Sequence, residues 1–326
     1  MKIKSVDVIF GASYGDEGKG KICYRRAKDY DYVCRYNGGP NAGHTVYHEG
    51  QKIVTHSVPV GIVHNKRCLI GPNCVLSAQL FSEELEYLSG LGLDTSLIKV
   101  HPHAHMITEK HLIRDKFLKS IFGTTGQGVG PCLADKAIRT GQRAEELIDS
   151  KYLWDGELEG RVLCESAQGV YLDINFGEYP YVTSSECMPY SACSIGFSPK
   201  LIDKIIAVSK MYDTRAGFDT YFGKPEDMND DMRSLATLGE EFGATTGRPR
   251  TCKWLNLDKI IKAICMTGAT EIIFNKGDIL EKLGVYKLYF ENKEVEFNTI
   301  DEMKQFIKIQ IAESDCPIGV TFDFEC

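Results

Sequence analysis

The feature that most constrains the fold is an apolar run, Val6–Phe10, that leads directly into the glycine-rich segment GASYGDEGKGKI, Gly11–Ile22. A buried strand followed by a glycine turn, a lysine and a plausible helix from Ile22 is typical of a phosphate-binding loop in an α/β sheet. Glycines also make ordinary tight turns, so this loop taken alone does not establish a phosphate site.

Short apolar runs alternate with amphipathic stretches along the rest of the chain. Three more runs predict buried strands, the second of which is also compatible with a helix, and two stretches have helical spacing. The runs are Arg161–Cys164, Lys204–Ser209 and Glu271–Phe274, and the helical stretches are Ala78–Leu91 and Asp258–Thr267. This alternation predicts an α/β fold with a large, mostly parallel central sheet flanked by helices, built as a single domain over residues 1–326.

Composition excludes some classes of function. The net charge of −7 over 326 residues argues against a nonspecific nucleic-acid binder or a membrane-surface protein. No apolar run approaches the length of a membrane span, and the segment MKIKSVDVIF lacks the layout of a signal peptide. The twelve cysteines are scattered without a C-x-x-C pair, so we expect free thiols in a reducing cytoplasm.

The glycine-rich segment is not a Walker A loop, which reads G-x-x-x-x-G-K-[ST]. Ser13 takes the place of the first glycine, and Gly20 takes the place of the hydroxyl that helps to hold magnesium. Magnesium would then need another hard oxygen ligand, which Asp16 can supply. The same carboxylate is a candidate general base acting on a second substrate.

Three later segments offer groups that bind anions. In YNGGPNAGHTV, His44 could donate a hydrogen bond to a phosphoryl oxygen. In FGTTGQGVGPCLADKAIRTG, the hydroxyls of Thr124 and Thr125, with Arg139 one predicted helix further on, suit a phosphomonoester. The segment GATTGRPRTCKW carries hydroxyls and guanidinium groups suited to carboxylates, on Thr245, Thr246, Arg248 and Arg250. Ordinary turns and solvated helix faces are the alternative explanation of each segment.

The segment EIIFNKGD, Glu271–Asp278, ends a predicted buried strand with the pattern N-K-x-D, which is often used to select guanine. Asp278 could accept hydrogen bonds from N1–H and the 2-amino group of guanine. Adenine would leave that acceptor unpaired, which is costly in a buried site.

His101, His103 and His105 alternate in KVHPHAHM and would align three imidazoles on a strand. Pro102 interrupts that pattern, and no cysteine or acid completes a zinc site convincingly. We therefore do not expect a metal ion there.

Taken together, these segments resemble one family closely, the adenylosuccinate synthetases, and the short archaeal and phage members in particular. Seven motifs occur in the order of that family over nearly the whole chain: GDEGKGKI, PNAGHTV, GTTGQGVGP with DKAIRTG, SAQGVYLDINFGEYPYVTSS, DTRAG, GATTGRPRTCKWL and NKGD. The family joins L-aspartate to the 6-position of a purine nucleotide and uses GTP and Mg²⁺. GTP first phosphorylates the 6-oxygen, and the amine of aspartate then displaces the phosphate.

The resemblance implies a role for each matching residue. Asp16 would remove the proton at purine N1 and, with the backbone carbonyl of Gly43, ligate Mg²⁺, and His44 would stabilise the phosphoryl group in transfer. Arg139 corresponds to an arginine that reaches into the site of a neighbouring subunit, which implies a homodimer. The expected GTP contacts are Glu17, Gly18, Lys19, Gly20, Gly43, His44, Thr45, Asn275, Lys276 and Asp278. The expected contacts of the acceptor nucleotide are Asp16, Asn41, Thr124, Thr125, Arg139, Gln168 and Thr183. The expected aspartate contacts are Thr245, Thr246, Arg248 and Arg250.

Three features resemble a phage branch of the family that makes 2-aminoadenylosuccinate from dGMP, on the route to 2,6-diaminopurine in phage DNA. They are Gly-Pro-Asn at positions 39–41, Gln127, and Cys-Met-Pro at positions 187–189. Asp16 departs from that branch, whose better-known members carry serine there. We favour GMP or dGMP as the acceptor, and IMP, on the route to AMP, is the alternative. The segment PIGVTFDFEC also lacks the Gly-Pro pair that usually packs near the guanine of GTP.

Two other classes of protein fit the sequence less well. A regulatory GTPase would need a Walker A loop and a D-x-x-G switch, and the sequence contains neither. A nucleotide sensor without turnover would have no need of Asp16, Lys19 and His44, all of which are present. The sequence therefore favours an enzyme that acts on small molecules rather than on nucleic acid or membranes.

Overall fold

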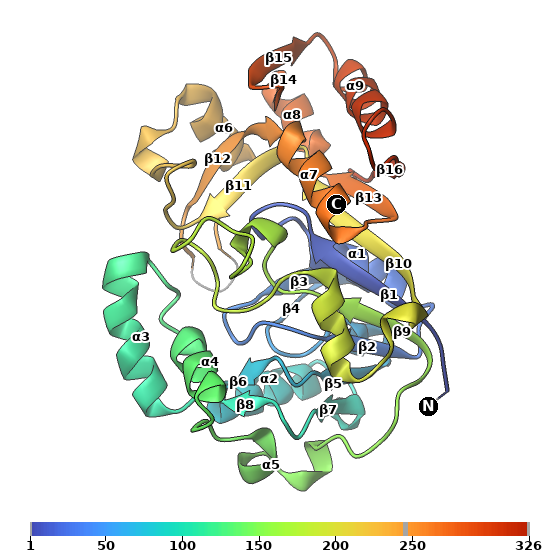
Figure 1. Cartoon of the computed structure of the whole chain (residues 1–326), viewed down its shortest axis with the longest axis vertical. Helices are drawn as coiled ribbons and strands as arrows, with labels where there is room; N and C mark the ends of the chain where they lie inside the picture. The colour runs from blue at the N-terminus through green and yellow to red at the C-terminus, as the bar shows by residue number, and fades with distance from the viewer. Residues whose placement is uncertain (1, 244–246, 325–326) are drawn as a thin grey trace.

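A computed structural model describes residues 2–243 and 247–324. Eight strands form one sheet in the order β16-β13-β10-β1-β9-β2-β5-β7, and every neighbouring pair is parallel (Figure 1). Their bounds are β1 Lys2–Gly11, β2 Tyr32–Arg35, β5 Arg67–Ile70, β7 Ile98–Val100, β9 Glu159–Glu165, β10 Ile202–Lys210, β13 Glu271–Asn275 and β16 Gly319–Phe322. The predicted α/β fold with a large parallel sheet is confirmed.

Helices surround this sheet. Helix α1 follows β1, and α2, α3 and α4 lie around the opposite half of the molecule from α7, α8 and α9 (Figure 1). The helices are α1 Lys19–Ala27, α2 Ala78–Gly90, α3 Glu109–Phe122, α4 Val129–Ala137, α5 Ala144–Leu147, α6 Asp230–Leu238, α7 Leu257–Thr267, α8 Gly277–Leu283 and α9 Ile300–Ala312. Both helices predicted from apolar spacing are confirmed as α2 and α7, whereas the first helix begins at Lys19, before the expected Ile22.

A second, four-stranded sheet has the order β11-β12-β14-β15 and contains antiparallel pairs. Its strands are β11 Tyr212–Ala216, β12 Arg250–Asn256, β14 Tyr286–Phe290 and β15 Lys293–Phe297. Only one residue separates the end of β10 from the start of β11, so the two sheets meet there. Two short pairs complete the described strands: β3 His44–His48 with β4 Gln51–Thr55, and β6 Val75–Leu76 with β8 His105–Met106.

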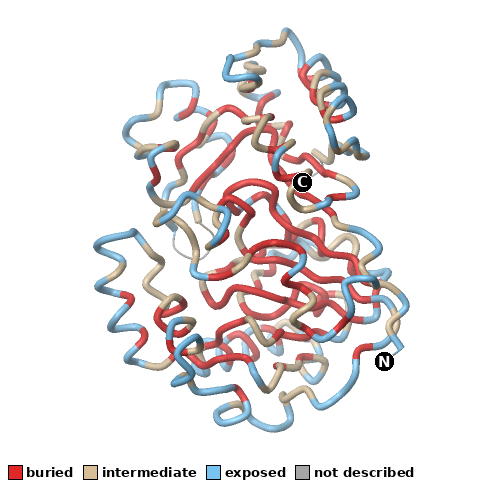
Figure 2. The backbone as a smooth tube through the Cα atoms, viewed as in Figure 1, coloured by how far each residue is buried: buried red, intermediate tan, exposed pale blue. Residues whose placement is uncertain are grey.

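The central strands are buried on both faces, as a parallel sheet covered by helices requires. In β1, the side chains of Val6, Val8, Ile9 and Phe10 are completely buried, and the tube in Figure 2 is red through the middle of the main sheet. The ambiguous run from Lys204 lies in β10 and is therefore a strand. Because the strands are parallel, the loops after β1, β9 and β13 emerge at the same edge.

The remaining predictions of local structure can be checked in the same way. All eleven cysteines in the described part of the chain are free thiols, eight of them buried. His101 and His103 lie in the turn after β7 rather than on a strand, and no group of three or more candidate ligands for a metal ion occurs among the described residues. Within the same residues, no helix has both the length and the apolar character needed to cross a membrane.

Candidate active site

The loop between β1 and α1 is folded around the carboxylate of Glu17. One oxygen of Glu17 accepts hydrogen bonds from the backbone N–H groups of Ser13, at 3.2 Å, and Gly15, at 2.7 Å. The other oxygen lies 2.5 Å from Nζ of Lys19. Both ionic side chains are buried, so Glu17 holds the loop together and fixes the position of Lys19. The sequence suggested Glu17 as a contact of GTP, whereas its carboxylate is turned inward.

Glycines at the N-terminus of α1 let other residues approach the helix closely. Gly18 caps the helix with a φ of 87°, a value that strongly favours glycine. A Cβ added at Gly20 would lie 2.7 Å from Cβ of His44, so only glycine lets the histidine pack directly on the first turn. Lys19, Gly20 and His44, three of the expected contacts of GTP, therefore lie close together, and the helix N-terminus beside them favours a phosphate group.

His44, the first residue of β3, is held by a buried ion pair. Arg35 and Glu165, at the ends of the neighbouring strands β2 and β9, pair at 2.8 Å. Nδ1 of His44 lies 3.5 Å from the same carboxylate oxygen of Glu165. Burial, and then the charge of Arg35, lower the pKa of His44 to about 4. The imidazole is therefore neutral at neutral pH and can donate one hydrogen bond without adding a charge.

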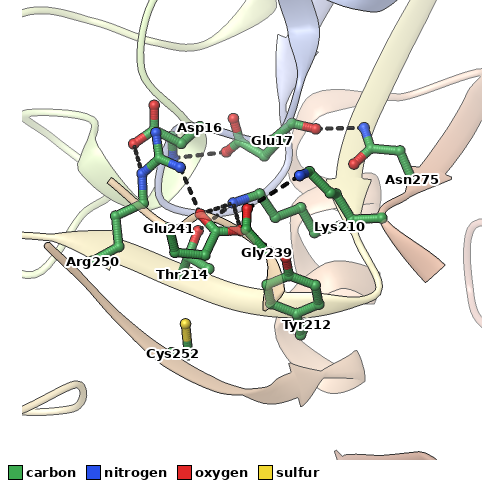
Figure 3. Close-up of polar contacts among 12 residues, drawn as sticks. Asp16, Glu17, Lys210, Tyr212, Thr214, Gly239, Glu241, Arg250, Cys252 and Asn275 are labelled. Atoms are coloured by element: carbon green, nitrogen blue, oxygen red, sulfur yellow. Dashed lines mark hydrogen bonds and ion pairs between the residues drawn. The ribbon is translucent and has the colours of Figure 1, made fainter. Parts of the chain in front are cut away.

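Asp16 and Arg250 bring the first loop and the β12 segment together (Figure 3). Nε of Arg250 lies 2.8 Å from a carboxylate oxygen of Asp16. Nη1 of the same guanidinium lies 2.5 Å from the carboxylate of Glu241. Asp16 has a φ of 60° and its side chain is 32% exposed, so it is the accessible member of this group.

Glu241 in turn is anchored from the junction of the two sheets. Nζ of Lys210 lies 2.8 Å from both of its oxygens, and the hydroxyl of Tyr212 donates a hydrogen bond to it at 2.6 Å. Although burial alone would raise the pKa of Glu241, the charges of Lys210 and Arg250 lower it to about 2. Lys210 also donates to the hydroxyl of Thr214 at 2.9 Å. The sequence analysis missed Lys210, Tyr212 and Glu241.

The N-K-x-D segment, residues 275–278, is joined to the loop between β1 and α1. The side-chain amide of Asn275 donates a hydrogen bond to the backbone carbonyl of Glu17 at 2.6 Å. Nζ of Lys276 donates to the carbonyl of Gly239 at 3.3 Å, next to the turn that carries Glu241. Asp278 lies in the first turn of α8 with its side chain 23% exposed, 3.3 Å from Nζ of Lys282. Asn275 thus braces the loop, and Asp278 is the accessible acceptor.

Several expected acceptor contacts lie on loops at the same sheet edge. Gln168 follows β9 with a φ of 58°, and its backbone would lie 3.7 Å from a Cβ at Gly15. Within the described residues, Oε1 of Gln168 and Oδ1 of Asn41 are buried without a hydrogen-bond partner. A ligand often satisfies such groups.

The other expected contacts differ in how they are placed. The hydroxyl of Thr124 donates a hydrogen bond to Asp115 at 2.7 Å, so this threonine is already engaged within the protein. Arg248 donates to the carbonyl of Gly123 at 2.8 Å, which joins the expected aspartate loop to the expected acceptor loop. Thr183 is half-buried, and Arg139 is exposed just beyond α4.

The remaining predicted contacts lie at the start of β3 and on the loop after α3. Gly43 directly precedes β3, and Thr45 lies on that strand opposite Val54. Thr125 lies on the loop after α3. The predicted contacts Thr245 and Thr246 lie outside the described residues.

The residues present are compatible with Mg²⁺. Magnesium commonly takes only one or two protein carboxylates and fills its other positions with substrate phosphates and water. Asp16 offers a hard, partly exposed carboxylate directly before the phosphate loop's lysine turn.

The sequence of the chain is similar to those of known proteins. The model of the adenylosuccinate synthetase family matches residues 8–159 and 155–310. The adenylosuccinate synthetase of Helicobacter pylori strain 26695 is 35% identical over 86% of this chain and 81% of its own length. That of Acidothermus cellulolyticus is 33% identical over 91% of this chain and 82% of its own length.

Two solved structures share the fold. The fully ligated adenylosuccinate synthetase of Plasmodium falciparum superposes with a TM-score of 0.77 at 28% identity, covering 93% of this chain and 86% of that one. The cyanophage S-2L succinoaminodeoxyadenylate synthetase (PurZ), bound to dGMP and to dATP as an energy donor, gives a TM-score of 0.71 and covers 95% and 99%. Its identity of 20% shows the common fold alone.

Fold, site and relatives together define a C–N ligase that acts on purine nucleotides. The chain belongs to the adenylosuccinate synthetase family. Enzymes of this family depend in general on GTP and Mg²⁺, and their substrates are small molecules.

Proposed function

We propose that this enzyme uses GTP and Mg²⁺ to join L-aspartate to C6 of GMP or dGMP, giving 2-aminoadenylosuccinate or its deoxy form. The observation that carries the ligase chemistry is the Asp16–Arg250 pair at 2.8 Å. It places a partly exposed carboxylate, suited to proton abstraction, beside a guanidinium suited to binding the carboxylates of aspartate. Lys19 of the glycine-rich loop and His44 follow Asp16 in the chain.

The proposed reaction proceeds in two steps. Asp16 accepts the proton from purine N1, the 6-oxygen attacks the γ-phosphorus of GTP, and GDP leaves. The amine of aspartate then attacks C6 and expels phosphate, whose oxygen came from the purine. Neutral His44 and the Lys19 ammonium face the transferring phosphoryl group and stabilise its charge. Mg²⁺, held by the carboxylate of Asp16 and the carbonyl of Gly43, would neutralise phosphate charge when bound.

The acceptor is a 6-oxopurine nucleotide in either version of the proposal. The unpartnered oxygens of Asn41 and Gln168 supply acceptors for donor groups of such a base. The cyanophage relative binds dGMP, and the three phage-like sequence features support a guanine nucleotide here. IMP is the second candidate, supported by Asp16 and by the 35% identity to bacterial adenylosuccinate synthetases.

GTP is the proposed phosphoryl donor, although the cyanophage relative was bound to dATP in that role. Support comes from Asp278, which lies at the start of α8 with an accessible carboxylate. A side chain at Gly277 would collide with the ring of Phe324, so the last described residue packs directly against this motif.

We also propose a homodimer in which Arg139 serves the neighbouring site. Arg139 is exposed, and the adjacent Ile138 is 65% exposed. On α3, Ile113, Phe117 and Ile121 form an apolar stripe at a spacing of four residues, with exposures of 61%, 68% and 53%. A second copy of the chain would cover such a patch. In sedimentation velocity the wild type should be a dimer and Phe117→Ser a monomer. A wild type that is itself monomeric would exclude the dimer.

The test of the reaction is phosphate release from GTP with Mg²⁺ and L-aspartate, comparing dGMP, GMP and IMP as acceptors. The proposal predicts aspartate-dependent release with a guanine nucleotide and little with IMP. Release with IMP alone would assign the enzyme to adenylosuccinate formation instead. Asp16→Asn should show no aspartate-dependent release while it unfolds at nearly the wild-type temperature, and wild-type turnover in this variant would exclude Asp16 as the base.

A further inference from the structure

Glu241 is the most heavily bonded side chain next to the site, although nothing about it suggests contact with a substrate. It is 1% exposed, and its two oxygens receive Lys210, Tyr212 and Arg250. Lys210 and Tyr212 flank Met211, the single residue between β10 of the main sheet and β11 of the second sheet. Glu241 is therefore a fixed acceptor.

Arg250 has two unequal partners. One carboxylate, Glu241, has three donors and is buried, whereas the other, Asp16, is 32% exposed. A guanidinium forms a planar fork whose edges pair with carboxylates in fixed directions. Glu241 holds one edge of the fork and so fixes the direction of the other edge, which points at Asp16 (Figure 3). Because Asp16 is the more exposed partner, it is the one that an incoming anion could replace.

We propose that Glu241, held by Lys210 and Tyr212, is a positioning residue that aims the Arg250 guanidinium at Asp16. We further propose that a carboxylate of the amino-acid substrate competes with Asp16 for that guanidinium. The proposal rests on the function proposed above. No covalent bond changes in this exchange, because one ion pair replaces another, and Asp16 is released toward the purine only when the amino acid is bound.

The exchange couples amino-acid binding to the first chemical step. With no amino acid bound, Asp16 is engaged by Arg250 and is not free to take the N1 proton. With the amino acid bound, Arg250 pairs with a carboxylate of the substrate, while Glu241 and Lys210 stay paired. Phosphorylation of the acceptor without aspartate would waste GTP, and this ion-pair exchange suppresses it.

The test separates positioning from stability with two variants. Glu241→Gln leaves the buried Lys210 ammonium without its charged partner, so it should lower both the melting temperature and the affinity for aspartate. The double variant Lys210→Met/Glu241→Gln removes the lysine together with its partner, so no unpaired ammonium stays buried at position 210 and the loss of stability should be smaller. In both variants we expect the KM for aspartate to rise about tenfold or more, as the loss of a charged hydrogen bond predicts, while the KM for GTP stays within about twofold.

Glu84→Gln is the matched control. Glu84 is also a buried acid, but it binds the segment after β4, through the backbone N–H groups of His56, Ser57 and Val58, rather than Arg250. This variant should be destabilised and keep the wild-type KM for aspartate. If the double variant recovers the KM for aspartate together with its melting temperature, or if Glu84→Gln also raises that KM, Glu241 has a structural role only and the proposal is wrong.

A readout without turnover distinguishes this proposal from the proposed function. The ¹⁵N signal of Arg250 Nε–H should be protected and sharp in the free enzyme, should move when aspartate is added, and should broaden in the double variant. If the wild type shows no aspartate-dependent turnover, the proposed function fails, and the signal still decides whether Glu241 holds Arg250. An Arg250 signal that is identical in wild type and double variant overturns the proposal whatever the activity.

Discussion

Replacing Glu17 by glutamine tests whether the phosphate loop is built around this carboxylate. The change keeps the size of the side chain but removes the charge that pairs with Lys19 at 2.5 Å. It also places an amide NH₂ against a loop that presents N–H donors from Ser13 and Gly15. Breaking a buried ion pair by removing one partner typically costs about 3–5 kcal/mol.

That energy converts to a measurable shift in melting temperature. Unfolding entropy of about 2.1 cal/mol/K per residue gives about 0.7 kcal/mol/K for 326 residues, so the expected fall is about 4–7 °C. Thermal unfolding followed by circular dichroism measures it, and the KM for GTP should rise in the same variant. Glu83→Gln, at an exposed position of α2, is the control and should shift the melting temperature by less than about 1 °C. A Glu17→Gln variant with unchanged melting temperature and unchanged KM for GTP would refute this account of the loop.

Three further predictions concern the walls of the site. Gly20→Ala should lower kcat by up to about a hundredfold and change the melting temperature little, because the new methyl group displaces His44; kinetics near the wild-type values would contradict this. The pKa of His44 falls from 6.5 to about 4 on folding, so the unfolded state binds more protons between these pH values and stability should drop by about 3 kcal/mol as the pH falls from 6.5 to 4. His44→Asn should remove this part of the pH dependence of stability. Burial raises the pKa of Asp213 to about 6, so Asp213 acts in the opposite direction, but its contribution cancels when the two proteins are compared. Identical profiles of stability against pH in the two proteins would rule out the contribution of His44. Asp278→Asn should abolish the preference for GTP over ATP in competition assays, and a preserved preference would refute the guanine assignment.

Local features of the sequence predicted the parts of the fold that depend on local order. The apolar run before the first glycine loop is β1, and the run from Lys204 is β10, since buried parallel strands are continuous apolar stretches. The same reasoning could not find the second sheet. Its strands β11 and β12 pair across a long insertion, and such pairing is set by tertiary packing rather than by local pattern.

The missed site residues show the same limit. Lys210 ends an apolar strand, and a buried lysine at such a position is a signal that the sequence analysis passed over. Glu240 and Glu241 are adjacent in the chain, and only the backbone turn decides which of the two carboxylates points inward. Asn275 was expected to contact GTP, and its bond to the carbonyl of Glu17 depends on two loops that meet only in the folded protein.

The central claim is that the purine 6-oxygen is phosphorylated before the amine of aspartate attacks C6, and isotope transfer tests it most directly. The acceptor that supports turnover, dGMP, GMP or IMP, would be labelled with ¹⁸O at the 6-position and incubated with GTP, Mg²⁺ and L-aspartate, and the released phosphate would be examined by mass spectrometry. The account predicts one ¹⁸O atom in each phosphate released. Unlabelled phosphate, formed together with the aspartate adduct, would contradict it.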